Sequence, residues 1–253
     1  MCSTINNSFS VFSQLPTKTP TAISFIIYSS IQPQRRTKSM TFSCSYNQSQ
    51  EQPITTTTTT QPQKSQTETY NIKFKTHKAC KLGISIYPNF VYNAEGGIGS
   101  GIAKGTNNTG LINEMEVSFD LHALYIPPLT SATTTFLGLP LPPFLKIDIV
   151  PELFQGTIDK DSRKVDLEFK AKFLFSVGSI YKAPALVVKT VLTSEESSGT
   201  MRRGIGQRLD KEGKCRLVGI ATIDPIDDVF MNTFLGLPTE CLADMNATIF
   251  LSS

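Results

Sequence analysis

The chain has 253 residues, of which 40% are hydrophobic, and a formal net charge of +3. The charge is uneven: residues 1–50 hold four basic and no acidic residues, whereas residues 51–253 hold 20 basic and 21 acidic ones. A nearly neutral body argues against nucleic-acid binding, and no apolar run reaches the ~18–20 residues that would span a bilayer as a helix.

The N-terminal region has the composition of a targeting segment. Residues 1–50 contain 17 Ser and Thr, together with Arg and Lys and no acids, which is typical of a transit peptide. We therefore predict a chloroplast transit peptide over residues 1–45 and a stromal location, with mitochondrial import as the alternative. Residues 46–68 are rich in Gln, Thr, Ser and Pro and cannot bury a core, so they predict a disordered linker.

From residue 69 to residue 253 we expect a single β-rich domain. Apolar and polar residues alternate with a period of two, most clearly from Val165 to Phe175, which predicts strands with one buried face. Similar strands are expected at 70–75, 82–92, 115–122, 144–150, 153–159, 185–193, 214–223 and 245–251. About nine or ten strands at this spacing predict an antiparallel, lipocalin-like β-barrel, with a sandwich as the alternative.

Two glycine-containing features interrupt this pattern. The glycines from Gly96 to Gly105 lack the following helix of a dinucleotide-binding fingerprint, and we interpret them as a flexible hairpin or lid. The sequence Thr-Phe-Leu-Gly-Leu-Pro occurs at 135–140 and again at 233–238, with prolines Pro127 and Pro225 at the same offset. This pseudo-repeat predicts two short helices that pack against the sheet or close an end of the barrel.

Candidate chemistry is sparse. The five cysteines are scattered without C-x-x-C spacing, and the histidines His77 and His122 belong to no ligand-spaced cluster, so we expect neither a disulfide framework nor a metal or other cofactor. His122 shares a polar strand face with Glu116 and Asp120, which suits acid–base chemistry and equally suits a solvent-facing strand.

Tyrosines are the other candidates for a site. A phenol at the mouth of an apolar cavity can orient a carbonyl or enol oxygen, and we consider Tyr87, Tyr125 and Tyr181 for this role; the alternative is that they are core rings with satisfied hydroxyls. Tyr125 stands out because it immediately precedes Ile126-Pro127-Pro128. For ligand contact we expect Phe119, Phe136 and Phe173, together with Arg202, which instead suits a solvated loop.

The residues 136–148 (FLGLPLPPFLKID), continuing through Val165 to Lys182, resemble a family of uncharacterised plant plastid proteins that also has photosynthetic-microbe members. The resemblance covers most of residues 70–251 and implies a plastid β-rich domain, with no catalytic residues to carry over. The expected architecture is also similar to plastid β-barrel proteins such as allene oxide cyclase, a similarity of fold alone.

Three functions fit these observations. The first is binding of a small apolar ligand, such as an isoprenoid, oxylipin or lipid, in the barrel. The second is a cofactor-free cyclase or isomerase of a reactive terpenoid or oxylipin, working by folding its substrate and excluding water. The third is a structural or assembly factor for a plastid complex. An open apolar cavity would favour the first two and a filled core the third; ligand identity and oligomeric state stay open.

Overall fold

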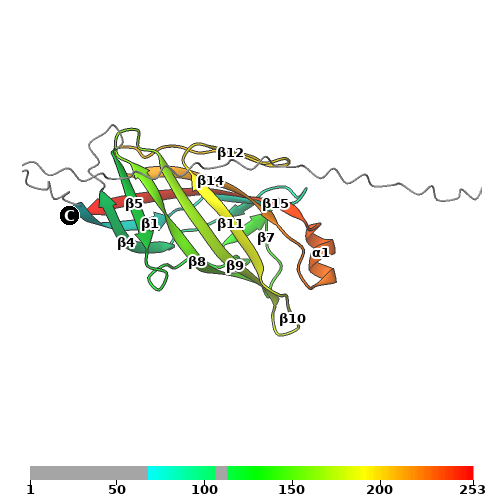
Figure 1. The fold of residues 1–253 in the computed structure, drawn as a ribbon. Coiled ribbons are helices and arrows are strands. Elements are labelled where there is room, and N and C mark those ends of the chain that lie inside the picture. The colour runs from blue at the N-terminus through cyan, green and yellow to red at the C-terminus, as the bar shows by residue number, and fades with distance from the viewer. Residues whose placement is uncertain (1–67, 106–112, 253) are drawn as a thin grey trace, which may run out of the picture. The chain divides into compact units, whose positions relative to one another are not determined.

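The computed structural model describes residues 68–105 and 113–252 of the chain. The predicted transit peptide and nearly all of the predicted linker lie outside these residues, as does Asn107-Asn108. Figure 1 shows strands throughout the described part, with one short helix, α1 (Val229–Leu235). The expectation of a mainly β, antiparallel structure is confirmed.

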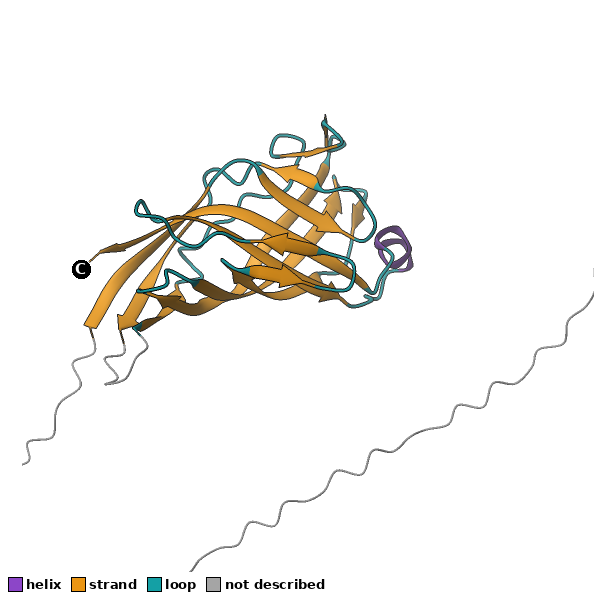
Figure 2. Cartoon of the chain, turned by 90° about the horizontal axis from the view of Figure 1, so that it is seen from above, coloured by secondary structure: helices purple, strands orange, loops and turns teal. Residues whose placement is uncertain are grey.

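Eight antiparallel strands form a closed ring. β1 pairs with β4 on one side and with β15 on the other, so the order β1-β4-β5-β8-β9-β11-β14-β15 returns to its start. The ring consists of β1 (Glu68–Thr76), β4 (Ile98–Gly105), β5 (Glu114–Phe119), β8 (Leu145–Asp159), β9 (Val165–Val177), β11 (Leu186–Thr193), β14 (Lys214–Ile223) and β15 (Thr239–Ser252). Figure 2 shows α1 at one end of these strands.

The period-two pattern decides which side of each ring strand is buried. On β5, for example, Met115, Val117 and Phe119 are buried while the residues between them are exposed. The strands predicted at 144–150 and 153–159 are one strand, β8, whose register with β9 shifts between Pro151 and Leu153. Proline has no N–H for the ladder, and a bulge at this point accommodates it.

The glycine-rich region is a ring strand, β4, and the prediction of a flexible hairpin or lid was wrong. A Cβ on Gly101 would lie 2.1 Å from the carbonyl oxygen of Ser118 on β5. Gly156 on β8 is equally constrained, since its Cβ would lie 2.0 Å from the carbonyl oxygen of Asp166 on β9. Glycine is therefore required here by close approach of neighbouring strands rather than by flexibility.

A second layer of short strands branches from β15. The C-terminal part of β15 lies beside β1, whereas residues 241–244 of the same strand lie beside β2 (Cys80–Ile84). The sheet then continues through β3 (Phe90–Tyr92), β6 (Thr134–Phe136) and β7 (Leu139–Pro140). A backbone bridge between Leu129 and Ile147 ties the segment before β6 to β8. Beyond this layer, β10 (Tyr181–Lys182) pairs with β9, and β12 (Glu196–Ser198) with β13 (Arg203–Ile205).

The two copies of the pseudo-repeat adopt different structures, which corrects the prediction of two short helices. The second copy forms the end of α1. The first copy forms the β6–β7 hairpin, with Leu137 and Gly138 both at positive φ in the two-residue turn. Among the described residues, α1 is the only helix, and no helix there is long and apolar enough to cross a bilayer.

Aromatic side chains fill the part of the ring nearest β1, β4 and β5. The rings of Phe74, Phe119 and Phe154 pack together with centroids 4.5 to 5.9 Å apart. Ile72, Leu167 and the other members of this cluster are almost completely buried. Buried side chains pack the interior of this half of the ring, and the apolar cavity of the fold lies toward the other end.

Candidate functional site: an apolar cavity closed by a short helix

The other end of the ring is hollow. A cavity of about 680 Å³ lies between the ring strands β9, β11, β14 and β15 and the layer of short strands β2, β3, β6 and β7. Its lining is almost wholly apolar and includes six phenylalanines, Phe90, Phe136, Phe169, Phe173, Phe175 and Phe234. Cavities of ~300–1,000 Å³ with apolar walls are typical of small-molecule sites.

The two strands that flank β11 supply much of the cavity wall. The inward face of β9 presents Phe169, Phe173 and Phe175, whereas the inward face of β14 presents Gly219 and Ala221 at alternate positions. A Cβ on Gly219 would lie 2.8 Å from the Thr190 hydroxyl oxygen on β11, so the close approach of β11 requires this glycine, and Ala221 is the other small residue of this wall. The same period-two pattern that predicts the strands therefore also places the walls of the cavity.

Polar groups in the lining are few, and their hydrogen bonds are directed to the protein backbone. The Thr190 hydroxyl donates to the carbonyl oxygen of Ile220 at 2.9 Å, and the Tyr87 hydroxyl donates to that of Phe234 at 2.7 Å. Burial raises the pKa of the Cys241 thiol to about 11, so the thiol is protonated at neutral pH. No charged side chain is among the lining residues that the structure describes.

Helix α1 closes one end of the cavity with the side chains of Met231, Phe234 and Leu235. Asp228 caps the helix, since its carboxylate accepts the backbone N–H of Met231 at 2.8 Å. Gly236 ends the helix in the left-handed conformation, with φ of 64°. The helix has only seven residues, too few to be stable by itself in water, so its position depends on contacts with its neighbours.

Two tyrosines hold α1, one at each end. Tyr181 donates its hydroxyl to the Asp228 carboxylate at 2.6 Å and packs its ring edge-on against Phe230. The hydrogen bond lowers the pKa of Asp228, while burial, followed by the bond to Asp228, raises the pKa of Tyr181 to about 12. At the other end, Tyr87 bonds the Phe234 carbonyl, and its ring lies 5.9 Å from that of Phe234.

Arg202 fixes the loop that carries Tyr87. Its guanidinium donates to the carbonyl oxygens of Ser85 and Tyr87, each at 2.6 Å, and to the Asn89 side chain at 2.7 Å. The backbone N–H of Arg202 is in turn accepted by the Glu240 carboxylate at 2.9 Å. The guanidinium is thus committed to the β2–β3 loop and does not line the cavity.

The structure brings some of the predicted site residues to the cavity and leaves others elsewhere. Tyr87, Phe136 and Phe173 line the cavity, and Tyr181 supports α1 beside it. Phe119 belongs to the filled half of the ring. Tyr125 and His122 are exposed and outside the lining: Tyr125 pairs its backbone with Ile98, and the backbone N–H of His122 donates to the Asp120 side chain at 2.9 Å.

Several lining residues were not predicted, although the sequence contained a signal for them. Both copies of the pseudo-repeat face the cavity, the first through Phe136, Leu137 and Leu139 and the second through Phe234 and Leu235. The recurrence of a rare six-residue sequence could have identified these residues as parts of one site.

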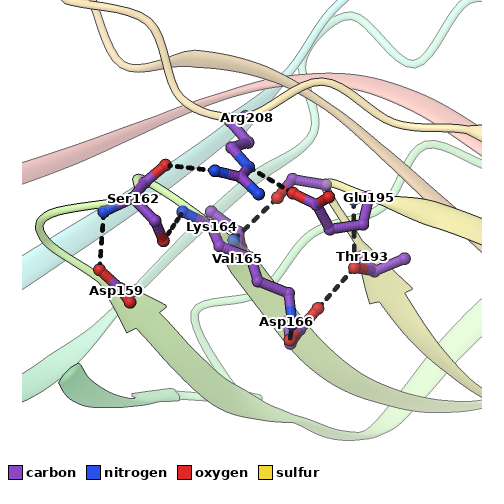
Figure 3. Close-up of polar contacts among 9 residues, drawn as sticks. Asp159, Ser162, Lys164, Val165, Asp166, Thr193, Glu195 and Arg208 are labelled. Atoms are coloured by element: carbon purple, nitrogen blue, oxygen red, sulfur yellow. Dashed lines mark hydrogen bonds and ion pairs between the residues drawn. The ribbon is translucent and has the colours of Figure 1, made fainter. Parts of the chain in front are cut away.

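The most connected polar cluster lies outside the cavity and is structural. Figure 3 shows that the turn between β8 and β9 is fastened to the end of β11 and to Arg208. The Asp159 carboxylate accepts the Ser162 N–H at 2.8 Å, and Lys164 pairs with Asp166 at 2.7 Å. Arg208 pairs with Glu195 and so completes the cluster. Within residues 68–105 and 113–252, no group of three or more His, Cys, Asp or Glu side chains is placed to hold a metal ion.

Comparison with protein-family models, with curated proteins and with solved structures found no match to this chain. The resemblance to the plant plastid family therefore stays a prediction.

Proposed function

We propose that this protein binds a small apolar molecule, of the isoprenoid, oxylipin or lipid class, inside an eight-stranded β-barrel. The observation that carries the proposal is the cavity of about 680 Å³, whose described lining holds no charged side chain. Removing apolar surface from water at ~25 cal/mol per Å² is the driving force that such walls provide. The composition of residues 1–50 supports a plastid stroma as the place where this happens.

The volume sets the size of the ligand. An apolar cavity of ~150 Å³ binds benzene, which has six carbons, so by proportion a cavity of about 680 Å³ holds at most on the order of 27 carbon atoms. A diterpenoid or a long acyl chain fits within this limit. The ligand needs at most one or two polar groups, which fit beside the hydroxyls of Tyr87 and Thr190 at the wall.

The lining favours a binding protein over an enzyme. Acid–base chemistry needs a titratable group near the operating pH, and the described lining offers a phenol and a protonated thiol. A structural factor would be expected to fill its interior with side chains, as the other half of this ring does with Phe74, Phe119 and Phe154. Keeping the cavity open costs stability, which a ligand offsets.

The test is ligand binding by the purified full chain. Organic extraction and native mass spectrometry identify any co-purified molecule, and titration with a fluorescent fatty acid measures the affinity. We expect saturable binding that the cavity-blocking variant Ala221→Phe weakens at least tenfold and the surface variant Tyr125→Phe leaves unchanged. The proposal is wrong if wild type and Ala221→Phe bind equally or if no apolar molecule binds.

The same preparation distinguishes a carrier from a cyclase. Reactive dialdehydes or enols are incubated with the protein, and the products are analysed by chiral chromatography. A binding protein leaves product ratio and stereochemistry as they are in buffer. An altered ratio that Ala221→Phe abolishes would identify the protein as a cofactor-free cyclase acting in the same cavity.

A further inference from the structure

The cavity is surrounded by large apolar side chains that face solvent. Six of them, between 70% and 91% exposed, define what we call the apolar rim: Ile86, Leu137, Leu139, Phe144, Ile180 and Val229. They come from five separate segments, namely the β2–β3 loop, the β6–β7 hairpin, the loop before β8, the turn after β9 and the start of α1. Isolated exposed apolar residues are ordinary, whereas such a concentration marks an interaction surface.

Contacts join four of the five segments, all except the β6–β7 hairpin. The loop before β8 touches the turn after β9, since Gly178 N–H donates to the Phe144 carbonyl at 2.9 Å. That turn leads to Tyr181, whose ring packs on Phe230 of α1. Along α1, Phe230 stacks on Phe234, which packs on Tyr87 of the β2–β3 loop. Figure 1 shows α1 and β10 at the same end of the described strands.

The rim is also continuous with the cavity. Leu137 and Leu139 are about 70% exposed and at the same time belong to the cavity lining. An apolar surface therefore runs from solvent into the interior without a polar barrier at the hairpin. An apolar ligand that fills this cavity would be poorly soluble in water and would partition into membranes, so a lipid phase is the source that this opening suits.

The charges of the rim segments select the kind of lipid surface. Residues 123–145 and 85–89 contain no charged side chain. The remaining segments carry one base, Lys182, against three acids, Asp224, Asp227 and Asp228, and the Arg202 guanidinium bound to the β2–β3 loop adds a second base. Anionic membranes attract clusters of Lys and Arg, and this rim has the opposite balance. Apolar tips on short turns with little positive charge suit insertion into an uncharged or zwitterionic bilayer surface.

We propose that the apolar rim docks onto an uncharged lipid surface and that the cavity exchanges its ligand with the bilayer there. This inference rests on the proposed function, because it assigns the membrane as the source or destination of the same ligand. Ile180, 91% exposed, and Phe144, 80% exposed, are the large apolar side chains that face solvent on these two adjoining turns. Both should enter the lipid headgroup region.

The test is flotation of the full chain with phosphatidylcholine vesicles, at low and high salt. The rim variant is the double substitution Phe144→Ser with Ile180→Ser. The control is Ile205→Ser, which removes a side chain identical to that of Ile180, 66% exposed, from β13 outside the rim; the single variant Ile180→Ser is the matched comparison for it. We expect wild type and control to float alike in both salts. Burying a large apolar side chain is sufficient for about a tenfold change in partitioning, so the rim variant should partition at least tenfold more weakly.

Three results would overturn the inference: no binding to phosphatidylcholine vesicles, equal binding by the rim variant, or binding seen only when anionic phosphatidylglycerol is added. Sedimentation velocity tests whether a second copy of the chain covers the rim instead. A wild-type dimer that becomes a monomer in the rim variant would show that it does. Binding of a fluorescent fatty acid in solution, measured without vesicles on the same variants, reports on the cavity alone. A protein that binds the fatty acid but not the vesicles would leave the proposed function standing and reject membrane docking.

Discussion

Filling the cavity should stabilise the protein, and the chain offers a matched control for this prediction. Ala221 on β14 lines the cavity, whereas Ala103 on β4 is completely buried in the filled half of the ring. We expect Ala221→Leu to raise the free energy of unfolding and Ala103→Leu to lower it. The chemical change is identical, and only the space beside the side chain differs.

The magnitude follows from the carbons added. Leucine has three more carbons than alanine, worth ~2.4 kcal/mol at ~0.8 kcal/mol per buried CH₂, and loses ~0.5–1 kcal/mol of side-chain entropy on burial. The net gain for Ala221→Leu is about 1.5 kcal/mol, or about 3–6 °C in Tm for a folded unit of this size. Overpacking by Ala103→Leu should cost about 1–3 kcal/mol.

The assay is urea unfolding of the ligand-free full chain, followed by intrinsic tyrosine fluorescence and by circular dichroism. Organic extraction beforehand is essential, because a bound ligand stabilises wild type by mass action and would hide the gain. The reasoning is refuted if both leucine variants destabilise the protein equally. That result would mean that β14 and β9 leave no usable space between them.

Three further predictions concern the groups around the cavity. Tyr87→Phe removes the hydrogen bond to the end of α1, and we expect a loss of about 0.5–1.5 kcal/mol in stability together with faster exchange of a bound fluorescent fatty acid; unchanged exchange in stopped-flow would show that the bond does not hold α1. Glu152 pairs with Lys170 and Lys172, which lowers its pKa from 4.5 to about 2; its stabilising contribution is complete above pH 4.5 and lost as the pH falls toward 2, so Glu152→Gln should flatten the acid limb of the stability curve. If the stability of the variant falls as steeply with decreasing pH as that of wild type, the acid sensitivity belongs to other groups. Cys241 should react slowly with an apolar maleimide at neutral pH, because its pKa is raised to about 11, and bound ligand should slow it further; peptide mass spectrometry would contradict this if ligand leaves the rate unchanged.

Much of the fold could be predicted because strand periodicity is local. The alternation from Val165 to Phe175 places Phe169 and Phe173 on an inward face whatever the partner strands are. The strand β4 (Ile98–Gly105) could not be predicted in this way, since its glycines carry no apolar pattern. Glycine is needed there because a carbonyl oxygen of a strand elsewhere in the sequence lies too close for a Cβ. For Gly101 this is the carbonyl oxygen of Ser118.

The candidate site was harder to predict than the strands, because it depends on which end of the ring a residue occupies. Phe119 and Phe173 have the same inward pattern in the sequence, yet one lies in the filled half and the other in the cavity. Tyr125 and Tyr87 both follow strand-like segments, and only Tyr87 reaches α1. Local periodicity shows which face of a strand points inward. Where the interior is open depends on long-range pairing, since β15 pairs with β1 along one part and with β2 along another.

The pseudo-repeat shows how neighbouring residues decide the structure of an identical sequence. In both copies the glycine has positive φ, 82° at Gly138 and 64° at Gly236, so this position has one conformation in both structures. The difference lies upstream. Asp228 supplies a helix cap before the second copy, whereas the first copy follows two threonines, Thr133 and Thr134, which favour strands and are weak helix formers. Glycine therefore ends a helix in one copy and turns a hairpin in the other. Because both structures direct their phenylalanine into the same cavity, what the repeat preserves is the apolar wall rather than the secondary structure.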